Sequence, residues 1–225
     1  MHETIKQAEN KRQREYFASA GFLILFIVIV GIAAVLLETE YIQWPFRRQA
    51  CVLDTYKNVL VYLPMLVFAF LSMGWLKVAE TPIWDVFYWK KPSISFYLAL
   101  SVSAGYSIYL FVTCRFDLKG VGFWPPVVIL SLFNSVAEEI IYRHVIMGLT
   151  KKIVGHSFLP NLIQSLFYGL VHIPIGGIRL GIYAFCYGLL LGWVMQKNQN
   201  LIPCILSHFC IDIGNIGLPL LVLLP

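Results

Sequence analysis

Charged residues are scarce in this sequence of 225 residues. Only 13% of the residues are Asp, Glu, Lys or Arg and 59% are hydrophobic, whereas a soluble domain has about 25% charged residues. This shortage excludes an ordinary water-soluble globular domain. The 17 Lys and Arg outnumber the 12 Asp and Glu and give a net charge of +5. They are spread over helix ends and loops instead of forming one stripe, so no nucleic-acid partner is indicated.

Cysteine pairs are missing as well. The five cysteines include no CxxC pair, and most lie in or beside apolar segments, so neither a disulfide framework nor a zinc finger is indicated. A cleavable signal peptide is also not indicated. The first apolar run, 17–37, is longer than the core of such a peptide and ends in an acidic stretch. We expect this run to be retained as a membrane span.

Long apolar runs are what the sequence contains instead. A transmembrane helix needs about 20 mostly apolar residues, and such runs recur from Phe17 almost to the C-terminus. We predict an all-α, polytopic transmembrane helix bundle with about seven to eight spans, after a polar N-terminal segment at 1–16. The expected spans are 17–37, 58–76, 94–114, 126–148, 158–173, 178–196 and 201–217.

Two patterns bear on how these spans are arranged. More of the Lys and Arg fall in the predicted inner segments when the N-terminus is placed inside, which predicts a cytoplasmic N-terminus and a multi-pass protein of the cell membrane. Gly177, Gly181, Gly188 and Gly192 lie on one face of the span 178–196. Small residues at this spacing allow helices to approach closely. We expect close packing there, with a substrate groove as the alternative.

Acidic residues are almost absent from the second half of the chain. After Asp117 the sequence has only Glu138, Glu139 and Asp212, and all three lie within predicted spans. An ionisable group at that depth costs about 2.5–3.5 kcal/mol on insertion scales, and such groups usually face the bundle interior and mark a function. The sequence therefore predicts a functional site in the C-terminal half.

The first element of this site is Glu138-Glu139 followed by Arg143. On a helix Glu139 and Arg143 are four residues apart and share a face, so they are expected to pair. Glu138 points about 100° away from Glu139 and lacks this partner. Either both glutamates belong to one structural ion-pair network, or Glu139 is the structural member and Glu138 is a reactive general base. We favour the second interpretation.

Two histidines complete the set. Tyr168 and His172 are four residues apart, and Pro174 indicates that the helix ends or bends just after this histidine. His208 and Asp212 repeat the same spacing in another span. Each histidine taken alone is as well explained by helix packing. Together with the glutamates, these residues from three separate spans predict a convergent polar site.

These three elements resemble, in order and spacing, the motifs of the CPBP family. This family comprises type II CAAX prenyl endopeptidases, bacteriocin-processing and self-immunity proteins and abortive-infection proteins. Its pattern is EExxxR, FxxxH and then HxxxN or HxxxD. The first and third motifs are intact here, whereas in the second Tyr168 takes the aromatic position and Phe167 lies one place early. The resemblance covers about residues 120–217. The first three spans match only as generic membrane helices, so we expect N-terminal transmembrane helices at 17–119 and a CPBP-like catalytic core at 120–225.

The resemblance also implies an activity and a role for each residue. It implies an intramembrane endopeptidase in which Glu138 and His172 activate water. Glu139 and Arg143 would form a supporting ion pair, next to the aromatic Tyr168. His208 with Asp212 would stabilise the oxyanion of the reaction.

Two questions about this chemistry stay open at the level of sequence. Zinc is an alternative to a metal-free mechanism, because Glu138, His172 and His208 are a suitable set of three ligands. No HExxH pair fixes two histidines on one helix, and we favour the metal-free mechanism. Asp212 can donate to an oxyanion only when it is protonated. When ionised, it is expected to orient and charge His208 instead.

The expected substrate is a membrane-associated peptide or protein, prenylated or bacteriocin-like, because the site lies within the lipid bilayer. One rival function is a non-enzymatic scaffold or bacteriocin-immunity protein of the same family, in which the polar cluster only holds helices together. Another is a transporter that uses Glu138 and Asp212 as proton sites. The sequence shows no inverted repeats of the kind that many transporters have.

Overall fold

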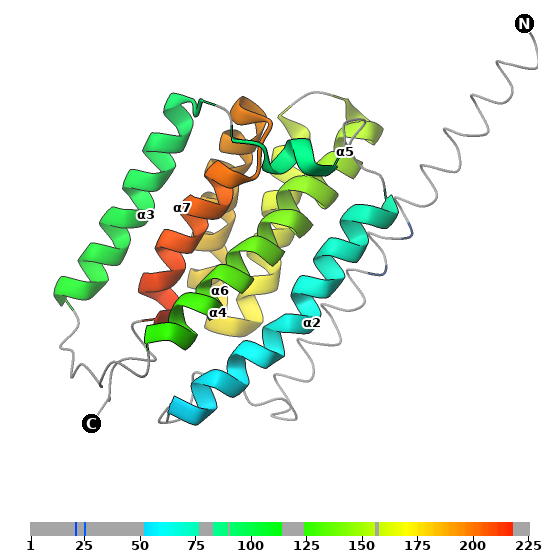
Figure 1. Cartoon of the computed structure of the whole chain (residues 1–225). Coiled ribbons are helices and arrows are strands. Elements are labelled where there is room, and N and C mark those ends of the chain that lie inside the picture. The colour runs from blue at the N-terminus through cyan, green and yellow to red at the C-terminus, as the bar shows by residue number, and fades with distance from the viewer. Residues whose placement is uncertain are drawn as a thin grey trace, which may run out of the picture.

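The computed structural model describes residues 21, 25, 52–76, 83–89, 91–113, 124–155 and 158–217. All regular structure in these residues is helical (Figure 1), which confirms the predicted all-α class for this part of the chain. The span expected at 17–37 lies outside the described residues, apart from two positions. The α-helices are α2 (Val52–Leu76), α3 (Ile94–Thr113), α4 (Trp124–Glu139), α5 (Met147–Val154), α6 (Leu159–Asn198) and α7 (Ile202–Asp212).

Three helical stretches are long and apolar enough to cross a membrane, which is consistent with an integral membrane protein. Each of them coincides with a predicted span. A shorter apolar helix, Tyr62–Gly74, lies within α2. The three long stretches are Ile94–Thr113, Trp124–Val154 and Gly177–Asn198.

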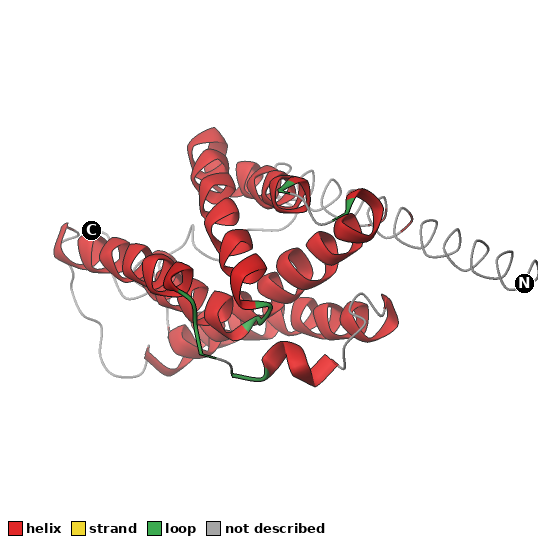
Figure 2. Ribbon diagram, turned by 90° about the horizontal axis from the view of Figure 1, so that it is seen from above, coloured by secondary structure: helices red, strands yellow, loops and turns green. Residues whose placement is uncertain are grey.

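The helices pack side by side around one buried core. α7 packs against both α3 and α4, and α2 covers another side of α4 (Figure 1). α6 packs against α3, α5 and α7. In the view from above, a short loop at residues 199–201 joins α6 to α7 (Figure 2). Fully buried apolar side chains from several helices form the core, among them Leu130, Ile140, Leu191 and Leu201.

The helix that carries the two glutamates changes its geometry directly after them. α4 ends at Glu139, and the next seven residues, η4 (Ile140–Ile146), are π-helical before α5 resumes the α-helix. Every residue of η4 is buried. Short π-helical segments within α-helices occur frequently at functional sites. The sequence analysis did not predict this segment.

α6 is helical throughout its 40 residues but folds back on itself as a hairpin. A straight helix of this length would extend about 60 Å. Instead, the side-chain Nε2 of Gln164 donates to the carbonyl oxygen of Gly188 at 2.9 Å, and Nδ2 of Asn161 donates to that of Leu189 at 3.0 Å. Gly177 has a φ of 75° at the turn, a conformation that favours glycine. The bend predicted near Pro174 is therefore present, three residues later.

The glycines of the second arm of this hairpin have two different roles. A Cβ atom added to Gly181, Gly188 or Gly192 would lie 3.2 Å or less from an atom of the first arm. These three glycines permit the close packing that the sequence predicted. Gly177 would meet nothing within 4 Å, so its place in the predicted packing stripe is wrong. It serves the turn instead.

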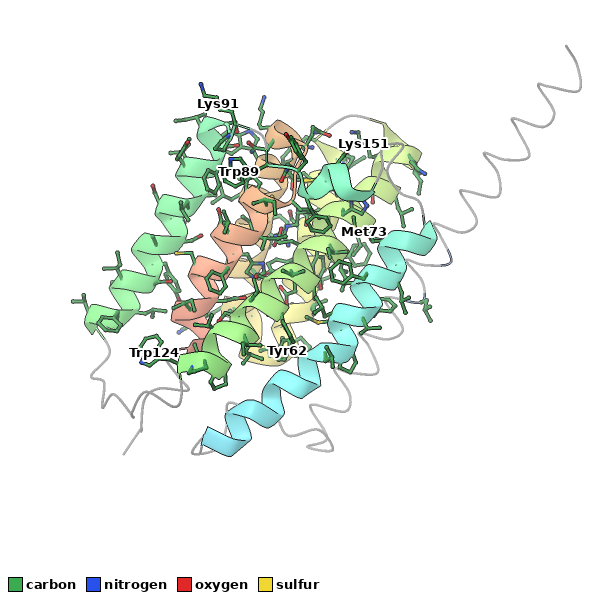
Figure 3. The ribbon with its side chains drawn as sticks, in the orientation of Figure 1. Tyr62, Met73, Trp89, Lys91, Trp124 and Lys151 are labelled. Atoms are coloured by element: carbon green, nitrogen blue, oxygen red, sulfur yellow. The ribbon has the colours of Figure 1, made fainter. Side chains whose placement is uncertain are left out.

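The loops at one end of the bundle are joined to each other. The 3-10 helix η2 (Ile83–Phe87) is held by the backbone N–H of Leu201, which donates to the carbonyl oxygen of Val86 at 2.8 Å. The N–H of Ser93 donates to Oδ1 of Asn198 at 2.7 Å. Lys91, Lys151 and Trp89 lie at this end, and Trp124 lies toward the other (Figure 3). Lys91 and Lys151 therefore share one side, as expected from the predicted topology.

Candidate active site

Four helical segments bring the predicted site residues together in the middle of the bundle. α4 contributes both glutamates at its C-terminal end, and η4 contributes the arginine one turn later. The first arm of α6 contributes the aromatic residue and one histidine, and α7 contributes the other histidine and the aspartate. These residues are Glu138, Glu139, Arg143, Tyr168, His172, His208 and Asp212.

Glu139 is the centre of a buried ion network. Its Oε1 lies 3.0 Å from Nη1 of Arg143 and 2.7 Å from Nδ1 of His208, and neither the glutamate nor the arginine side chain is exposed. Because an ionised carboxylate only accepts hydrogen bonds, Nδ1 of His208 carries the proton. The network thus joins α4, η4 and α7 and fixes the orientation of this imidazole.

The buried positive charge of Arg143 is stabilised by one ion pair and by the faces of two aromatic rings. Its guanidinium carbon lies 4.5 Å from the ring centroid of Tyr168 and 5.8 Å from that of Tyr142. Its side-chain nitrogens make no hydrogen bond to the described residues. A buried charge with few partners is costly unless it is paired. Glu139 and the π face of Tyr168 therefore provide most of the stabilisation of this buried charge.

The other nitrogen of His208 faces three oxygen atoms. Nε2 lies 3.3 Å from the hydroxyl of Tyr168, 3.5 Å from Oδ1 of Asp212 and 3.6 Å from Oε2 of Glu138. The Glu138 side chain is 15% exposed, whereas that of Glu139 is not exposed. Oε2 of Glu138 is buried and has no hydrogen-bond partner in the described part of the chain. Glu138 thus has a carboxylate oxygen whose hydrogen-bonding capacity no described group satisfies.

His172 joins the site through Tyr168. Its Nδ1 lies 2.7 Å from the carbonyl oxygen of Tyr168, and the two rings are 4.5 Å apart. A carbonyl oxygen cannot donate, so Nδ1 bears a proton, and in the neutral imidazole Nε2 has the lone pair. Among the described residues, the imidazole within ion-pair distance of Glu138 is that of His208, not that of His172.

The part of the chain that contains this cluster matches a known protein family. Residues 120–214 match the sequence model of the Rce1-like type II CAAX prenyl endopeptidases. These residues form a domain of that family. The chain matches no curated protein and no solved structure. All the site residues named above, from Glu138 to Asp212, lie inside the matched region.

The described residues of the Rce1-like domain offer no ready zinc site. No group of three or more His, Cys, Asp and Glu side chains in the described residues is arranged to hold a metal ion. The alternative ligand set of Glu138, His172 and His208 is therefore not gathered as a metal site in this structure. Nδ1 of His208 is already bound to Glu139, which leaves only its Nε2 for another ligand.

Sequence reasoning missed two further residues near the cluster. Nδ2 of Asn134, which is 6% exposed, donates to Oδ2 of Asp212 at 2.9 Å. This asparagine lies four residues before Glu138, on the same face of α4, and that spacing is the signal that could have identified it. Tyr62 of α2 (Figure 3) lies close enough to Glu138 and Asp212 for their charges to act on its phenol. Tyr62 belongs to α2 and lies outside the residues that match the family.

Proposed function

We propose that this chain is an intramembrane endopeptidase that cleaves a membrane-associated peptide or protein, prenylated or bacteriocin-like. The Rce1-like family is a protease family, which gives the reaction class. The observation that carries the proposal is the position of Glu138. Its free carboxylate oxygen lies 3.6 Å from Nε2 of His208, inside a buried cluster built from three helices of the Rce1-like domain.

Glu138 is the proposed general base. Its Oε2 takes a proton from a water molecule, and the resulting hydroxide attacks the carbonyl carbon of the scissile peptide bond. The C–N bond then breaks, and the proton passes from Glu138 to the leaving amine. His172 assists in activating the water, since its Nε2 has the lone pair needed to accept a proton. Burial raises the strength of these interactions relative to bulk water.

The remaining residues support this reaction. Glu139 and Arg143 hold His208, and Nε2–H of that imidazole donates to the oxyanion of the tetrahedral intermediate. Oδ2 of Asp212 accepts a hydrogen bond from Asn134. Its other oxygen, Oδ1, lies 3.5 Å from Nε2 of His208, so we assign Asp212 the role of orienting and charging His208. The proposed mechanism uses no metal, and no step depends on one.

The proposed setting is the cell membrane, with a cytoplasmic N-terminus and with lysines such as Lys91 and Lys151 on the cytoplasmic side. The segment 1–16 is the proposed cytoplasmic N-terminus, 17–119 the N-terminal transmembrane part and 120–225 the catalytic core. A site at this depth suits a substrate that is itself anchored in the bilayer, as a prenylated peptide is.

The test replaces Glu138 by Gln, which keeps the shape of the side chain and removes the base. We expect cleavage to fall by roughly 10²–10⁴-fold, the usual contribution of a general base. The melting temperature should not change, because Oε2 of Glu138 has no hydrogen bond to lose. The measurement compares newly formed peptide termini in membranes with the unaltered chain, Glu138→Gln and no chain.

The matched control is Asp85→Asn, which makes the same chemical change at an exposed residue of η2. It should cleave as fast as the unaltered chain. If Glu138→Gln produces the same termini and the same phenotype as the unaltered chain, the protease function is wrong. The scaffold or immunity function would then be the better explanation of the cluster.

A further inference from the structure

The aromatic position of the second motif carries a hydroxyl group in this chain. Where the family pattern has phenylalanine, this sequence has Tyr168. The residue is 3% exposed, and its hydroxyl oxygen lies 3.3 Å from Nε2 of His208. A phenylalanine at this position would leave Nε2 without this neighbour. The hydroxyl is therefore an addition to the site.

The protons around His208 show what this hydroxyl can do. Nδ1 already donates to Glu139 at 2.7 Å. Of the three described oxygen atoms near Nε2, those of Asp212 and Glu138 belong to carboxylates, which only accept hydrogen bonds when ionised. Tyr168 is the one of the three that brings a proton of its own. When Nε2–H donates to a carboxylate or to the substrate, the phenolic proton is free to donate as well.

Two donors at this place would meet the needs of the proposed reaction. An oxyanion is best stabilised by preorganised donors aimed at the position where the charge develops. Nε2 of His208 and the hydroxyl of Tyr168 are 3.3 Å apart, and Nε2 is 3.6 Å from Oε2 of the base Glu138. Attack by a water molecule held at Glu138 would therefore place the new oxyanion beside both groups.

We propose that the hydroxyl of Tyr168 is a catalytic hydrogen-bond donor that shares the oxyanion of the tetrahedral intermediate with His208. The inference rests on the proposed function. No bond to Tyr168 forms or breaks. The phenolic proton stays on its oxygen, while the proton of the attacking water goes to Glu138 and then to the leaving amine.

The ring of Tyr168 is held by contacts that do not involve its hydroxyl. The guanidinium of Arg143 lies 4.5 Å from the ring centroid, and the rings of Tyr142 and His172 lie 4.9 and 4.5 Å away. Tyr168→Phe keeps all three contacts and restores the aromatic residue of the family pattern. The variant is expected to fold, so it separates the hydroxyl from the ring.

The experiment measures kcat and KM of the full-length chain in liposomes with a quenched fluorescent farnesylated peptide that ends in a CAAX sequence. We expect Tyr168→Phe to lower kcat on the order of 10²-fold, the cost of losing one oxyanion donor. KM should stay within about twofold, because the interaction is made in the transition state. Placing p-aminophenylalanine at position 168 restores an N–H donor and should raise kcat above that of the phenylalanine variant.

Tyr187→Phe is the matched control. The ring of Tyr187 also packs edge-on against His208, with centroids 6.0 Å apart, but its hydroxyl bonds to Oγ of Ser103 at 2.8 Å. This variant should keep the kcat of the unaltered chain. An unchanged kcat in Tyr168→Phe, or a change in KM alone, would overturn the inference. A loss of kcat in Tyr187→Phe equal to that in Tyr168→Phe would overturn it too.

The failure of this inference is distinguishable from the failure of the proposed function. If Glu138→Gln cleaves the peptide as fast as the unaltered chain, the proposed function is wrong. The proposed role of Tyr168 in stabilising the oxyanion is then wrong as well. If Glu138→Gln is inactive while Tyr168→Phe is fully active, the function stands and only the role of the hydroxyl is wrong.

Discussion

The two sides of His208 differ in how tightly their groups are bound. On the Nδ1 side, Glu139 and Arg143 are fully buried and held at 2.7 to 3.0 Å. On the Nε2 side, Glu138, Asp212 and Tyr168 lie at 3.3 to 3.6 Å, and the Glu138 side chain is 15% exposed. The first side has the geometry of a structural network. The second side has longer contacts and a partly exposed carboxylate, as expected of a site that binds another group.

This difference separates stability from activity. Glu139 and Arg143 on the Nδ1 side are fully buried and hold each other and His208, so changing them should mainly affect folding. Groups on the Nε2 side can bind water or substrate, so changing them should mainly affect the rate. Two adjacent residues of one helix, Glu138 and Glu139, therefore take opposite roles, because helical periodicity turns them toward different surroundings.

The largest effect is expected on the Nδ1 side, from Arg143→Met. This change leaves the Glu139 carboxylate buried without its cation, which should cost about 3–5 kcal/mol of stability. Thermal unfolding of the purified protein in detergent measures this loss. The double variant Glu139→Gln with Arg143→Met removes both charges and should recover part of it.

The control for this prediction is Arg179→Met, at an exposed position in the second arm of α6. It makes the same change where water can solvate the charge, and the melting temperature should be nearly unaffected. Equal melting temperatures for Arg143→Met and the unaltered chain would contradict the structural role of the Nδ1 side.

Sequence predicted the members of this site better than their contacts. Glu139 and Arg143 pair as their spacing indicated, although the helix becomes π-helical between them. The hydrogen bond between Glu139 and His208 joins residues that are 69 positions apart in the sequence. Such a contact depends on how two helices cross, which no local pattern encodes. The sequence therefore predicted convergence, but it did not predict which histidine lies next to Glu138.

The roles of uncharged residues were the hardest to predict from the sequence. Asn134 was missed because an amide in an apolar span is far less costly than a carboxylate and so is less conspicuous. Gly177 was misplaced for a related reason. A glycine at helical spacing has the same pattern whether it permits close packing or a positive φ, and only the backbone shows the difference.

A smaller effect is expected from Asn134→Leu, which tests how Asp212 is held on the Nε2 side. The change leaves Oδ2 of Asp212 buried without its donor, and an unsatisfied buried group costs roughly 1–3 kcal/mol. Thermal unfolding and the cleavage rate should both decline. Ser131→Ala is the matched control, one turn earlier in α4, because the Ser131 hydroxyl is buried and has no hydrogen bond in the described part of the chain. A variant Asn134→Leu as stable as Ser131→Ala would show that the amide does not support Asp212.

The smallest effect is expected from Asp212→Asn, which keeps the shape and removes the charge. A charge-assisted hydrogen bond is stronger than a neutral one, so kcat should fall about tenfold, equivalent to about 1.4 kcal/mol. Exchanging both residues, with Asn134→Asp and Asp212→Asn, retains one amide and one carboxylate but moves the charge away from His208. If the charge beside Nε2 is what matters, the exchanged pair stays slow in the same peptide assay. If the exchange restores full activity, Asp212 acts only as a hydrogen-bonding partner, and the Nε2 side needs no anion to orient its imidazole.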